Sequence, residues 1–144
     1  MHVDPTSTEA VVRHHLRAFL EQQGVAAIVS DYDDHARFLS EARVYRGKQE
    51  IGNFFTDFLA SLPVNAIERF TLRSLRVERN IAYITGCVDA EIPLGTDTFV
   101  VGDGKIISQT FAMHAAPTSV AAADMVGQQR PDVRSVVAPG GPRR

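Results

Sequence analysis

The hydrophobic spacing of the chain changes near Pro63, and this change restricts the possible folds more than any other feature of the sequence. Before Pro63, apolar residues recur at helical spacing in two stretches, Val12 to Phe19 and Ile51 to Leu62. After Ile67 the helical period disappears, and alternating or β-branched runs follow. Helices followed by a series of strands predict an α+β protein, not an alternating βαβ one.

Turn and cap signals divide the chain into elements. Thr6 and Glu9 form a potential capping box for the first helix, and Gly24 is placed to end it. The pattern then predicts a helical segment at 25–30, short strands at 36–39 and 44–45, a helix at 48–62, and strands at 70–77, 81–88, 96–101 and 106–113. The separators Arg79-Asn80, Pro93-Leu94-Gly95 and Asp103-Gly104 predict an antiparallel meander. We therefore expect three N-terminal helices on one face of a strongly curved, mainly antiparallel sheet, with a cone-shaped cavity between the layers.

Composition excludes several classes of protein. A chain of 144 residues that is 44% hydrophobic is long enough for one domain with its own core, which we place at residues 1–116. Residues 117–144 are rich in proline and glycine and are expected to form a mostly flexible tail. The lone cysteine excludes a disulfide scaffold, and the net charge of −2 argues against nucleic-acid binding. No apolar run is long enough to span a membrane, so we expect a cytoplasmic location.

Two polar side chains are the first candidates for chemistry. His15 lies at the edge of the apolar stripe of the first helix, where it can face the cavity, exchange a proton or donate a hydrogen bond. Asp97 shares a strand face with Phe99 and Val101, so burial should raise its pKa and let it act as a donor. Each has a structural alternative: a core histidine bonded to a backbone carbonyl, and an aspartate that accepts from turn amides.

The preceding strand supplies a third candidate. Tyr83, Cys87 and Asp89 alternate on one face, and a hairpin centred on Pro93 would set Asp89 nearly opposite Asp97, where the two carboxyls would share a proton. A bulge near Glu91 would instead turn Asp89 to solvent. Cys87 is interpreted as a small wall residue because no basic neighbour is evident to activate its thiol. The predicted contacts with a ligand are Phe19, Tyr32, Phe54, Phe58, Tyr83, Cys87, Phe99, Val101, Gln109, Phe111 and Met113.

The order of several short strings resembles the nuclear transport factor 2-like superfamily, including ketosteroid isomerases and SnoaL-like cyclases. The strings are Val11-Val12-Arg13-His14-His15, Tyr32-Asp33-Asp34-His35-Ala36, Tyr45-Arg46-Gly47-Lys48-Gln49-Glu50-Ile51, and Asp97-Thr98-Phe99 with Asp103-Gly104-Lys105-Ile106. The resemblance implies a helix-lined conical pocket and a dimer packed through the outer sheet face. It matches His15 to a substrate-binding tyrosine of the isomerases and Asp97 to their donor aspartate. Their general-base aspartate falls on Ser40, which cannot take a proton from carbon unaided.

These observations lead to one functional hypothesis and one alternative. The hypothesis is a pocket for an apolar molecule bearing a carbonyl or hydroxyl, with His15 and Asp97 holding that oxygen during cofactor-free isomerisation, dehydration or cyclisation. The alternative is a non-catalytic ligand-binding or assembly domain, which Ser40 favours. No metal is expected, because His15, His35 and His114 lack the spacing of a metal site. A homodimer would cover Leu72, Leu75, Val77, Ile84 and Val88, which we expect on the outer sheet face.

Overall fold

The structure is a computed structural model that describes residues 4–116, and its compact unit ends at His114. It contains the helices α1 (Thr8–Leu20), α2 (Val25–Val29) and α3 (Gly47–Ser61). The strands are β1 (Tyr32–Leu39), β2 (Val44–Arg46), β3 (Phe70–Glu78), β4 (Ile81–Val88), β5 (Ile92–Gly102) and β6 (Lys105–His114). The tail expected at 117–144 lies outside the described residues. No helix within residues 4–116 is both long and apolar enough to cross a membrane.

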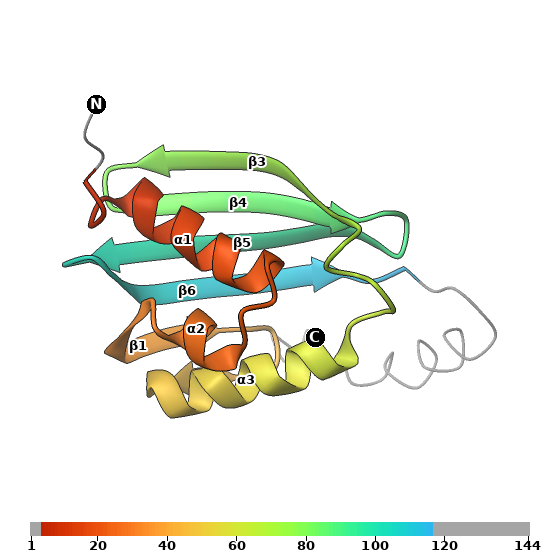
Figure 1. Cartoon of the computed structure of the whole chain (residues 1–144), viewed down its shortest axis with the longest axis horizontal. Helices are drawn as coiled ribbons and strands as arrows, with labels where there is room; N and C mark the ends of the chain where they lie inside the picture. The colour runs from red at the N-terminus through yellow and green to blue at the C-terminus, as the bar shows by residue number, and fades with distance from the viewer. Residues whose placement is uncertain (1–3, 117–144) are drawn as a thin grey trace, which may run out of the picture. The chain divides into compact units, whose positions relative to one another are not determined.

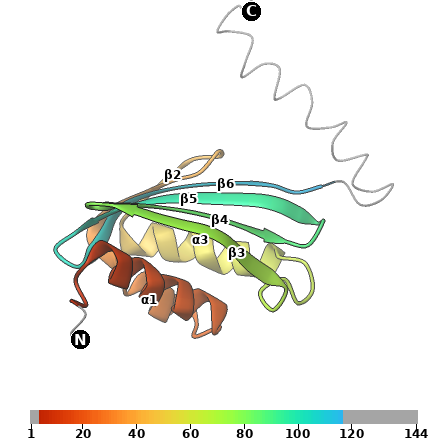
Figure 2. The same ribbon diagram turned by 90° about the horizontal axis from the view of Figure 1, so that it is seen from above.

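All six strands belong to one sheet, which has the order β2-β1-β6-β5-β4-β3. The strands β3 to β6 form the predicted antiparallel meander, while β1 runs parallel to β6 and antiparallel to β2. The helices lie in front of the sheet in Figure 1, and the view from above in Figure 2 places α1 and α3 on the same side of it. The α+β prediction is therefore confirmed, with a mixed sheet.

The first helix begins with a different cap from the one predicted. Ser7 is the N-cap, and its Oγ accepts a hydrogen bond from the Ala10 amide at 3.2 Å. Glu9 does not close a capping box but pairs with Arg13 one turn later at 2.8 Å. The helix ends at Leu20, before Gly24, whose φ of 102° serves instead to turn the chain into α2.

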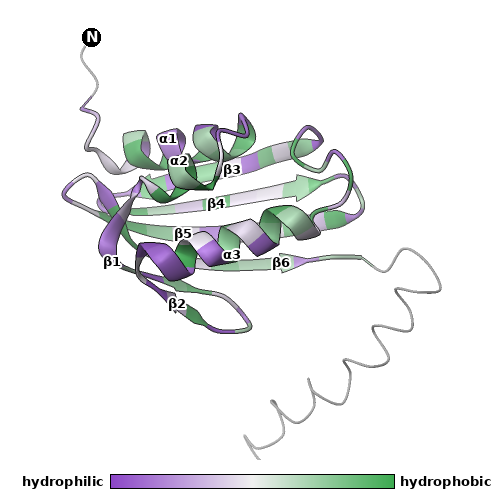
Figure 3. Cartoon of the chain, turned by 60° about the horizontal axis from the view of Figure 1, so that its bottom comes forward, coloured by the Kyte–Doolittle hydropathy of each residue, from purple (hydrophilic) through white to green (hydrophobic). Residues whose placement is uncertain are grey.

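The third helix turns an aromatic face toward the sheet. Its first turn is stabilised by the Glu50 carboxylate, whose Oε1 accepts a hydrogen bond from the Arg46 amide at 2.8 Å. Phe54, Phe55 and Phe58 follow at helical spacing and pack within the core cluster. In Figure 3 the ribbon of α3 is hydrophilic at its start and hydrophobic at its end. The aromatic side chains of this helix therefore form part of the hydrophobic core between the helices and the sheet.

The hairpin turns confirm two of the three predicted separators. Arg79 (φ 54°) lies between β3 and β4, and Asp103 and Gly104 (φ 50° and 77°) join β5 to β6, as a type I′ turn requires. The Pro93 prediction is wrong, because the chain turns at residues 89–91 and Pro93 lies inside β5. Proline is tolerated there because the β4–β5 register shifts between the Val88–Ile92 and Gly86–Gly95 pairs, where no ladder bond from Pro93 is needed.

The first strand begins earlier than the sequence predicts, at Tyr32. Its register against β6 jumps between the Tyr32–Ile106 and Arg37–Ser108 pairs, so the polar residues between them leave the regular ladder. This irregularity hides the strand from a search for alternation. Tyr32, at the start of the strand, is completely buried in the main core with Val12, Ile51, Phe99 and Ile106.

Candidate functional site

A cavity of about 110 Å³ lies between the helices α1 and α3 and the inner face of the sheet. Its volume approaches that of the roughly 150 Å³ apolar cavity that takes up benzene in another protein. The wall is formed by His15, Leu16, Phe19, Leu20, Phe38, Phe54, Phe55, Phe58, Leu62, Ala66, Ile67, Phe70, Ile84, Gly86, Cys87, Val88, Ile92, Gly95, Asp97, Phe99, Gln109, Phe111 and Met113. Almost all of these side chains are apolar, so the few polar ones decide what the cavity can do.

Aromatic rings make up much of the wall. Phe54 stacks on Phe58 with centroids 5.3 Å apart, and Phe111 meets Phe58 edge-on at 5.4 Å. Phe38 lies 4.4 Å from Phe54 across the space between β1 and α3. Such pairs prefer offset and edge-to-face geometry, and each contributes roughly 0.5–1.5 kcal/mol beyond its buried area. The wall is therefore well packed and presents an apolar surface to a bound molecule.

Asp97 is the carboxyl group of the cavity. It lies on β5 opposite Ile84 of β4 and Phe111 of β6, and its Oδ2 accepts a hydrogen bond from Gln109 Nε2 at 2.7 Å. Burial among apolar neighbours raises the pKa of Asp97 from 3.8 to about 7, and the Gln109 hydrogen bond opposes that rise. At neutral pH the group is therefore present in both its protonated and its ionised form.

The hydrogen bonding continues beyond the cavity wall to Tyr32. The Tyr32 hydroxyl donates to Gln109 Oε1, and both side chains are buried, at 0% and 2% exposure. Burial raises the pKa of Tyr32 well above 10, and the Asp97 carboxylate adds to the rise. Tyr32, Gln109 and Asp97 therefore form one connected chain that runs from β1 through β6 to β5. The tyrosine remains a neutral donor at every pH at which the protein is normally handled.

His15 projects from α1 into an aromatic environment. Its ring meets those of Tyr32, Phe55 and Phe99 edge-on at 5.4, 6.0 and 5.5 Å. Burial lowers the pKa of His15 from 6.5 to about 4, against the opposing effects of the Asp31 charge and a backbone hydrogen bond with Ile28. The ring is therefore neutral at pH 7. Its Nδ1 is buried and has no hydrogen-bond partner within residues 4–116.

Most of the predicted wall residues line the cavity. Those present are His15, Phe19, Phe54, Phe58, Cys87, Asp97, Phe99, Gln109, Phe111 and Met113. Tyr32 does not line it, because its ring fills the core behind the wall, and Val101 likewise packs in the core beyond the cavity. Tyr83 is wrongly placed by the prediction, since it is 41% exposed. The apolar Ala82 and Ile84 take the inner positions of β4, which leaves Tyr83 on the outer face.

Asp89 is also not at the site. The turn that carries it adopts a left-handed conformation (φ 46°) and faces solvent, where Asp89 pairs with Arg69 at 2.8 Å. The prediction of two adjacent carboxyls fails because the hairpin turns at 89–91 and not at Pro93, so that Ile84 lies opposite Asp97. Asp97 has no second carboxyl across the ladder with which to share a proton.

The expected outer sheet face is corrected in the same way. Ile84 and Val88 are 4% and 6% exposed and belong to the buried clusters, while Leu72 and Leu75 pack against the main core from β3. A register shift between Leu72 and Ser74 brings both leucines to the inner face despite their odd spacing. Of the five residues predicted to be outside, Val77 is the exposed one, at 37%.

Ser40 forms part of a turn after β1 and does not line the cavity. Its Oγ accepts from the amides of Ala42 and Arg43, both at 3.2 Å, and donates to the Arg43 carbonyl at 3.1 Å. Glu41 is exposed. A carboxylate base is therefore absent from this position, so any proton transfer in the cavity must use the groups around Asp97 and His15.

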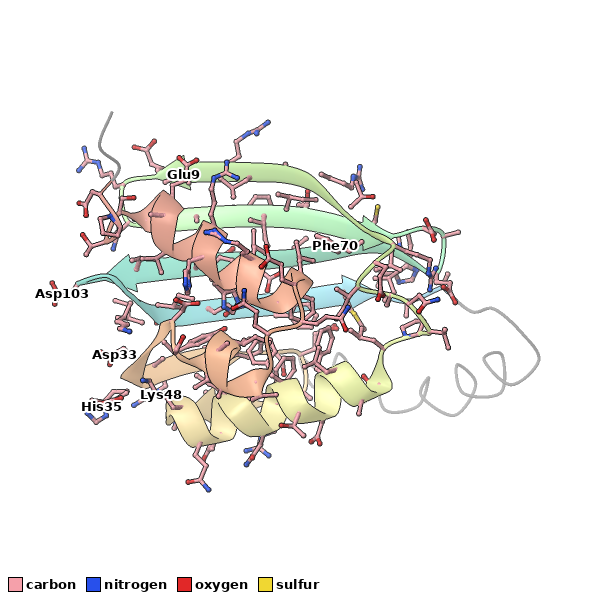
Figure 4. All side chains as sticks on the ribbon, in the orientation of Figure 1. Glu9, Asp33, His35, Lys48, Phe70 and Asp103 are labelled. Carbon is pink, nitrogen blue, oxygen red and sulfur yellow. The ribbon has the colours of Figure 1, made fainter. Side chains whose placement is uncertain are left out.

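Sequence reasoning missed the residues at the far end of the cavity, where β3 begins. Leu62, Ala66, Phe70, Val88 and Ile92 gather there into a second apolar cluster. Figure 4 shows Phe70 at this end of the sheet, whereas Asp103 marks the opposite end. A Cβ on Gly86 would lie only 2.4 Å from the Phe70 ring, so the ring packs directly on the glycine backbone. Gly86 in the middle of a strand was the available signal.

Metal ligation is not evident in the part of the chain that the structure describes, because no three His, Cys, Asp or Glu side chains come together there. No protein-family model matches the sequence, and no curated protein does either. Solved structures, however, match it over most of its length. An NTF-2 like protein of unknown function from Burkholderia xenovorans is 13% identical, with a TM-score of 0.62 over 82% of this chain and 91% of that one. The chain has the NTF2-like fold.

Two further structures with this fold carry names that refer to chemistry. A candidate ketosteroid isomerase from Kribbella flavida is 15% identical, with a TM-score of 0.59 over 78% of this chain and 81% of that one. A candidate polyketide cyclase from Sinorhizobium meliloti is also 15% identical, with a TM-score of 0.58 over 71% of this chain and 93% of that one. At these identities the likeness concerns the NTF2-like fold and not the residues of the site.

Proposed function

We propose that the cavity binds an apolar molecule bearing a carbonyl or hydroxyl group, and that the protein moves a proton next to that oxygen without a cofactor. Isomerisation, dehydration and aldol-type cyclisation all proceed in this way through an enol or enolate. The observation that carries the proposal is the Asp97 carboxyl, which lines this largely aromatic cavity and has a pKa of about 7. We propose that this cavity is the conical pocket that the sequence resemblance implies.

Asp97 supplies both halves of the chemistry. General acid–base catalysis is most efficient when the pKa of the group lies near the working pH. The ionised carboxylate takes a proton from the carbon beside the carbonyl, and the protonated form returns one to the substrate. Ser40 is hydrogen-bonded within its own turn and does not reach the cavity, so Asp97 takes over the role of the base.

His15 is assigned to binding rather than to proton abstraction. A histidine whose pKa is lowered to about 4 is neutral at pH 7 and is a weak base. His15 lines the cavity, and its buried Nδ1 has no partner within residues 4–116, which costs roughly 1–3 kcal/mol. A rotation of the ring that brings Nδ1 to the cavity would let a polar group of a bound ligand recover part of that cost. Asp97 can donate to the ligand oxygen only in its protonated form, that is, after it has taken the proton from carbon, and His15 is the second polar group of the wall near that oxygen.

The names of two structural neighbours agree with this chemistry, since one is a candidate isomerase and the other a candidate cyclase. The alternative is non-catalytic binding in the same cavity. The observation that favours the alternative is the serine at position 40, where the resemblance leads one to expect a base. The two hypotheses share the ligand and differ in whether a proton moves.

Hydrogen–deuterium exchange of a bound ketone distinguishes catalysis from non-catalytic binding. 2-Cyclohexenone in deuterated buffer exchanges protons next to its carbonyl, and NMR follows the rate with and without protein. Proton transfer by Asp97 predicts exchange above the buffer rate, and Asp97→Asn should lower the excess by about 10²-fold or more. Asp89→Asn is the matched control and should leave the rate unchanged, because Asp89 faces solvent. Binding without excess exchange would favour the alternative, and the absence of both would reject the cavity as a functional site.

We also propose that the protein forms a homodimer through the outer sheet face and resides in the cytoplasm. In the structure this face is formed by the solvent-facing side chains of β3 to β6. Among them, Tyr83 and Leu94 are each 41% exposed. Burying apolar surface of this kind is the general driving force for association. Analytical ultracentrifugation of the wild type and of Tyr83→Glu tests the dimer, which the charged variant should weaken.

A further inference from the structure

We infer that Tyr32 is a positioning residue that fixes the Gln109 amide so that the proton of Asp97 resides on the oxygen facing the cavity. Tyr32 does not line the cavity and does not touch the ligand position. Its influence passes through two hydrogen bonds, from the Tyr32 hydroxyl to Gln109 Oε1 and from Gln109 Nε2 to Asp97 Oδ2. The inference rests on the proposed function of Asp97 and specifies which atom of Asp97 acts.

The two hydrogen bonds select one orientation of the amide. A glutamine amide carries an acceptor oxygen and a donor nitrogen, which can exchange places by rotation. In the observed orientation the tyrosine donates to the oxygen and the nitrogen donates to the carboxylate. In the reversed orientation the Tyr32 hydrogen would lose its acceptor, because the hydroxyl has no other partner within residues 4–116. An ionised Asp97 would also face the Gln109 oxygen, which is repulsive.

The selected orientation decides where Asp97 carries its proton. Because Oδ2 already accepts a hydrogen bond from Gln109, protonation takes place at Oδ1. Asp97 lines the cavity. Its Oδ1 makes no hydrogen bond within residues 4–116 and is not a buried atom, so it is open to the cavity. A neutral Asp97 therefore directs its O–H into the cavity, where the matching group on a ligand is an acceptor, such as a carbonyl oxygen. The site selects ligands with an acceptor at this point.

Loss of the tyrosine hydroxyl should release the amide. In Tyr32→Phe, Gln109 is free to turn its oxygen toward Asp97 and accept a hydrogen bond from a protonated Oδ2. That arrangement favours the protonated form, so the pKa of Asp97 should rise above about 7. It also withdraws the donor from the cavity. The charged group besides Asp97 that acts on Tyr32 is Asp31, and His15 packs edge-on against the ring as a neutral neighbour.

The experiment uses the full chain and two readouts. The first is the pKa of Asp97, measured by carboxyl-carbon NMR in the ligand-free wild type, Tyr32→Phe and Tyr83→Phe. Tyr83→Phe is the matched control, since it removes a hydroxyl from the outer face of β4. The second is the binding preference for 2-cyclohexenone over cyclohexene, which differ by the carbonyl acceptor. We expect Tyr32→Phe to raise the pKa of Asp97 and to reduce the preference by about tenfold, as loss of one hydrogen bond predicts, and Tyr83→Phe to change neither.

A second variant protects the test against misfolding of the first. Tyr32→Met removes the same hydroxyl and keeps an apolar side chain in the buried position, so it should raise the pKa of Asp97 as Tyr32→Phe does. An Asp97 pKa equal to that of the wild type in whichever of the two variants folds would overturn the inference. If the wild type binds neither ligand, the proposed function fails, while the pKa measurement still decides whether Tyr32 acts on Asp97.

Discussion

Two aspartates of the β4–β5 hairpin have opposite environments. Asp97 lies on the inner face among aromatic side chains, accepts a hydrogen bond from Gln109 and has a pKa of about 7. Asp89 lies at the turn, is 60% exposed and is paired with Arg69 at 2.8 Å. The residue type and the hairpin are the same, and only the surroundings differ. The comparison shows that burial, not the presence of a carboxylate, makes one of these groups suitable for acid–base chemistry.

The strongest effect expected from this comparison is a change in how stability depends on pH. Asp97 has a raised pKa in the folded state, so its stabilising contribution is complete below pH 3.8 and is lost as the pH rises through 7. His15 has a lowered pKa, so its contribution is present above pH 6.5 and is lost as the pH falls through about 4. The two effects, roughly 4 kcal/mol for Asp97 and roughly 3 kcal/mol for His15, oppose each other between these limits.

Single variants should therefore reveal slopes that the wild type conceals. Urea unfolding at several pH values measures the free energy of unfolding. Asp97→Asn leaves the His15 effect alone, so its stability should fall as the pH is lowered from 6.5 to 4. His15→Leu leaves the Asp97 effect, so its stability should fall as the pH is raised from 4 to 7. Parallel curves for the two variants would contradict the assigned burial of both groups.

A smaller effect is expected from the packing of the hairpin. The Gly86→Ala methyl group would lie 2.4 Å from the Phe70 ring, whereas at Gly95 the nearest atom is 3.8 Å from the new carbon. Gly86→Ala should displace Phe70 and destabilise the protein by about 1–3 kcal/mol. Gly95→Ala should change stability much less, and urea denaturation of both proteins measures the difference. Equal costs would show that Phe70 does not rest on the strand backbone.

The smallest effect should come from the exposed carboxyl. Asp89→Asn removes one partner of Arg69, which also contacts Glu91 at 2.7 Å and the Val64 carbonyl at 2.8 Å. Exposed ion pairs of this kind contribute little, because water screens them and side-chain entropy opposes them. The midpoint of urea unfolding should be unchanged within error at any pH between 5 and 8. A large loss would mean that the turn, and not the inner face, stabilises this hairpin.

The architecture was accessible from the sequence because each element carries its own local signal. The change of period at Pro63, the Asp103-Gly104 turn and the alternation of β4 (Ile81–Val88) all appear within a few residues. Alternation alone, however, does not say which face is buried. The inner face of β4 was assigned from the predicted turn at Pro93. Because the structure has the turn at residues 89–91, Tyr83 and Asp89 do not face the site.

The candidate site was predictable only in part, for a related reason. His15 and Asp97 could be found because each is a polar residue on an apolar face. The connection between Tyr32 and Gln109 joins residues 77 positions apart, and it depends on the irregular start of β1. Likewise Leu72 and Leu75 share a face only because of a register shift. Bulges are not visible in periodicity, so the partners they create had to come from the structure.

The most direct test is a titration of Asp97 in the free wild-type protein. Carboxyl-carbon NMR of aspartate-labelled protein follows each group from pH 3 to 9, and Asp97→Asn identifies the signal that belongs to Asp97. Burial in the aromatic cavity predicts a pKa of about 7. A pKa close to the ordinary 3.8 would mean that water reaches the carboxyl freely, and the assignment of acid–base chemistry to this cavity would be wrong.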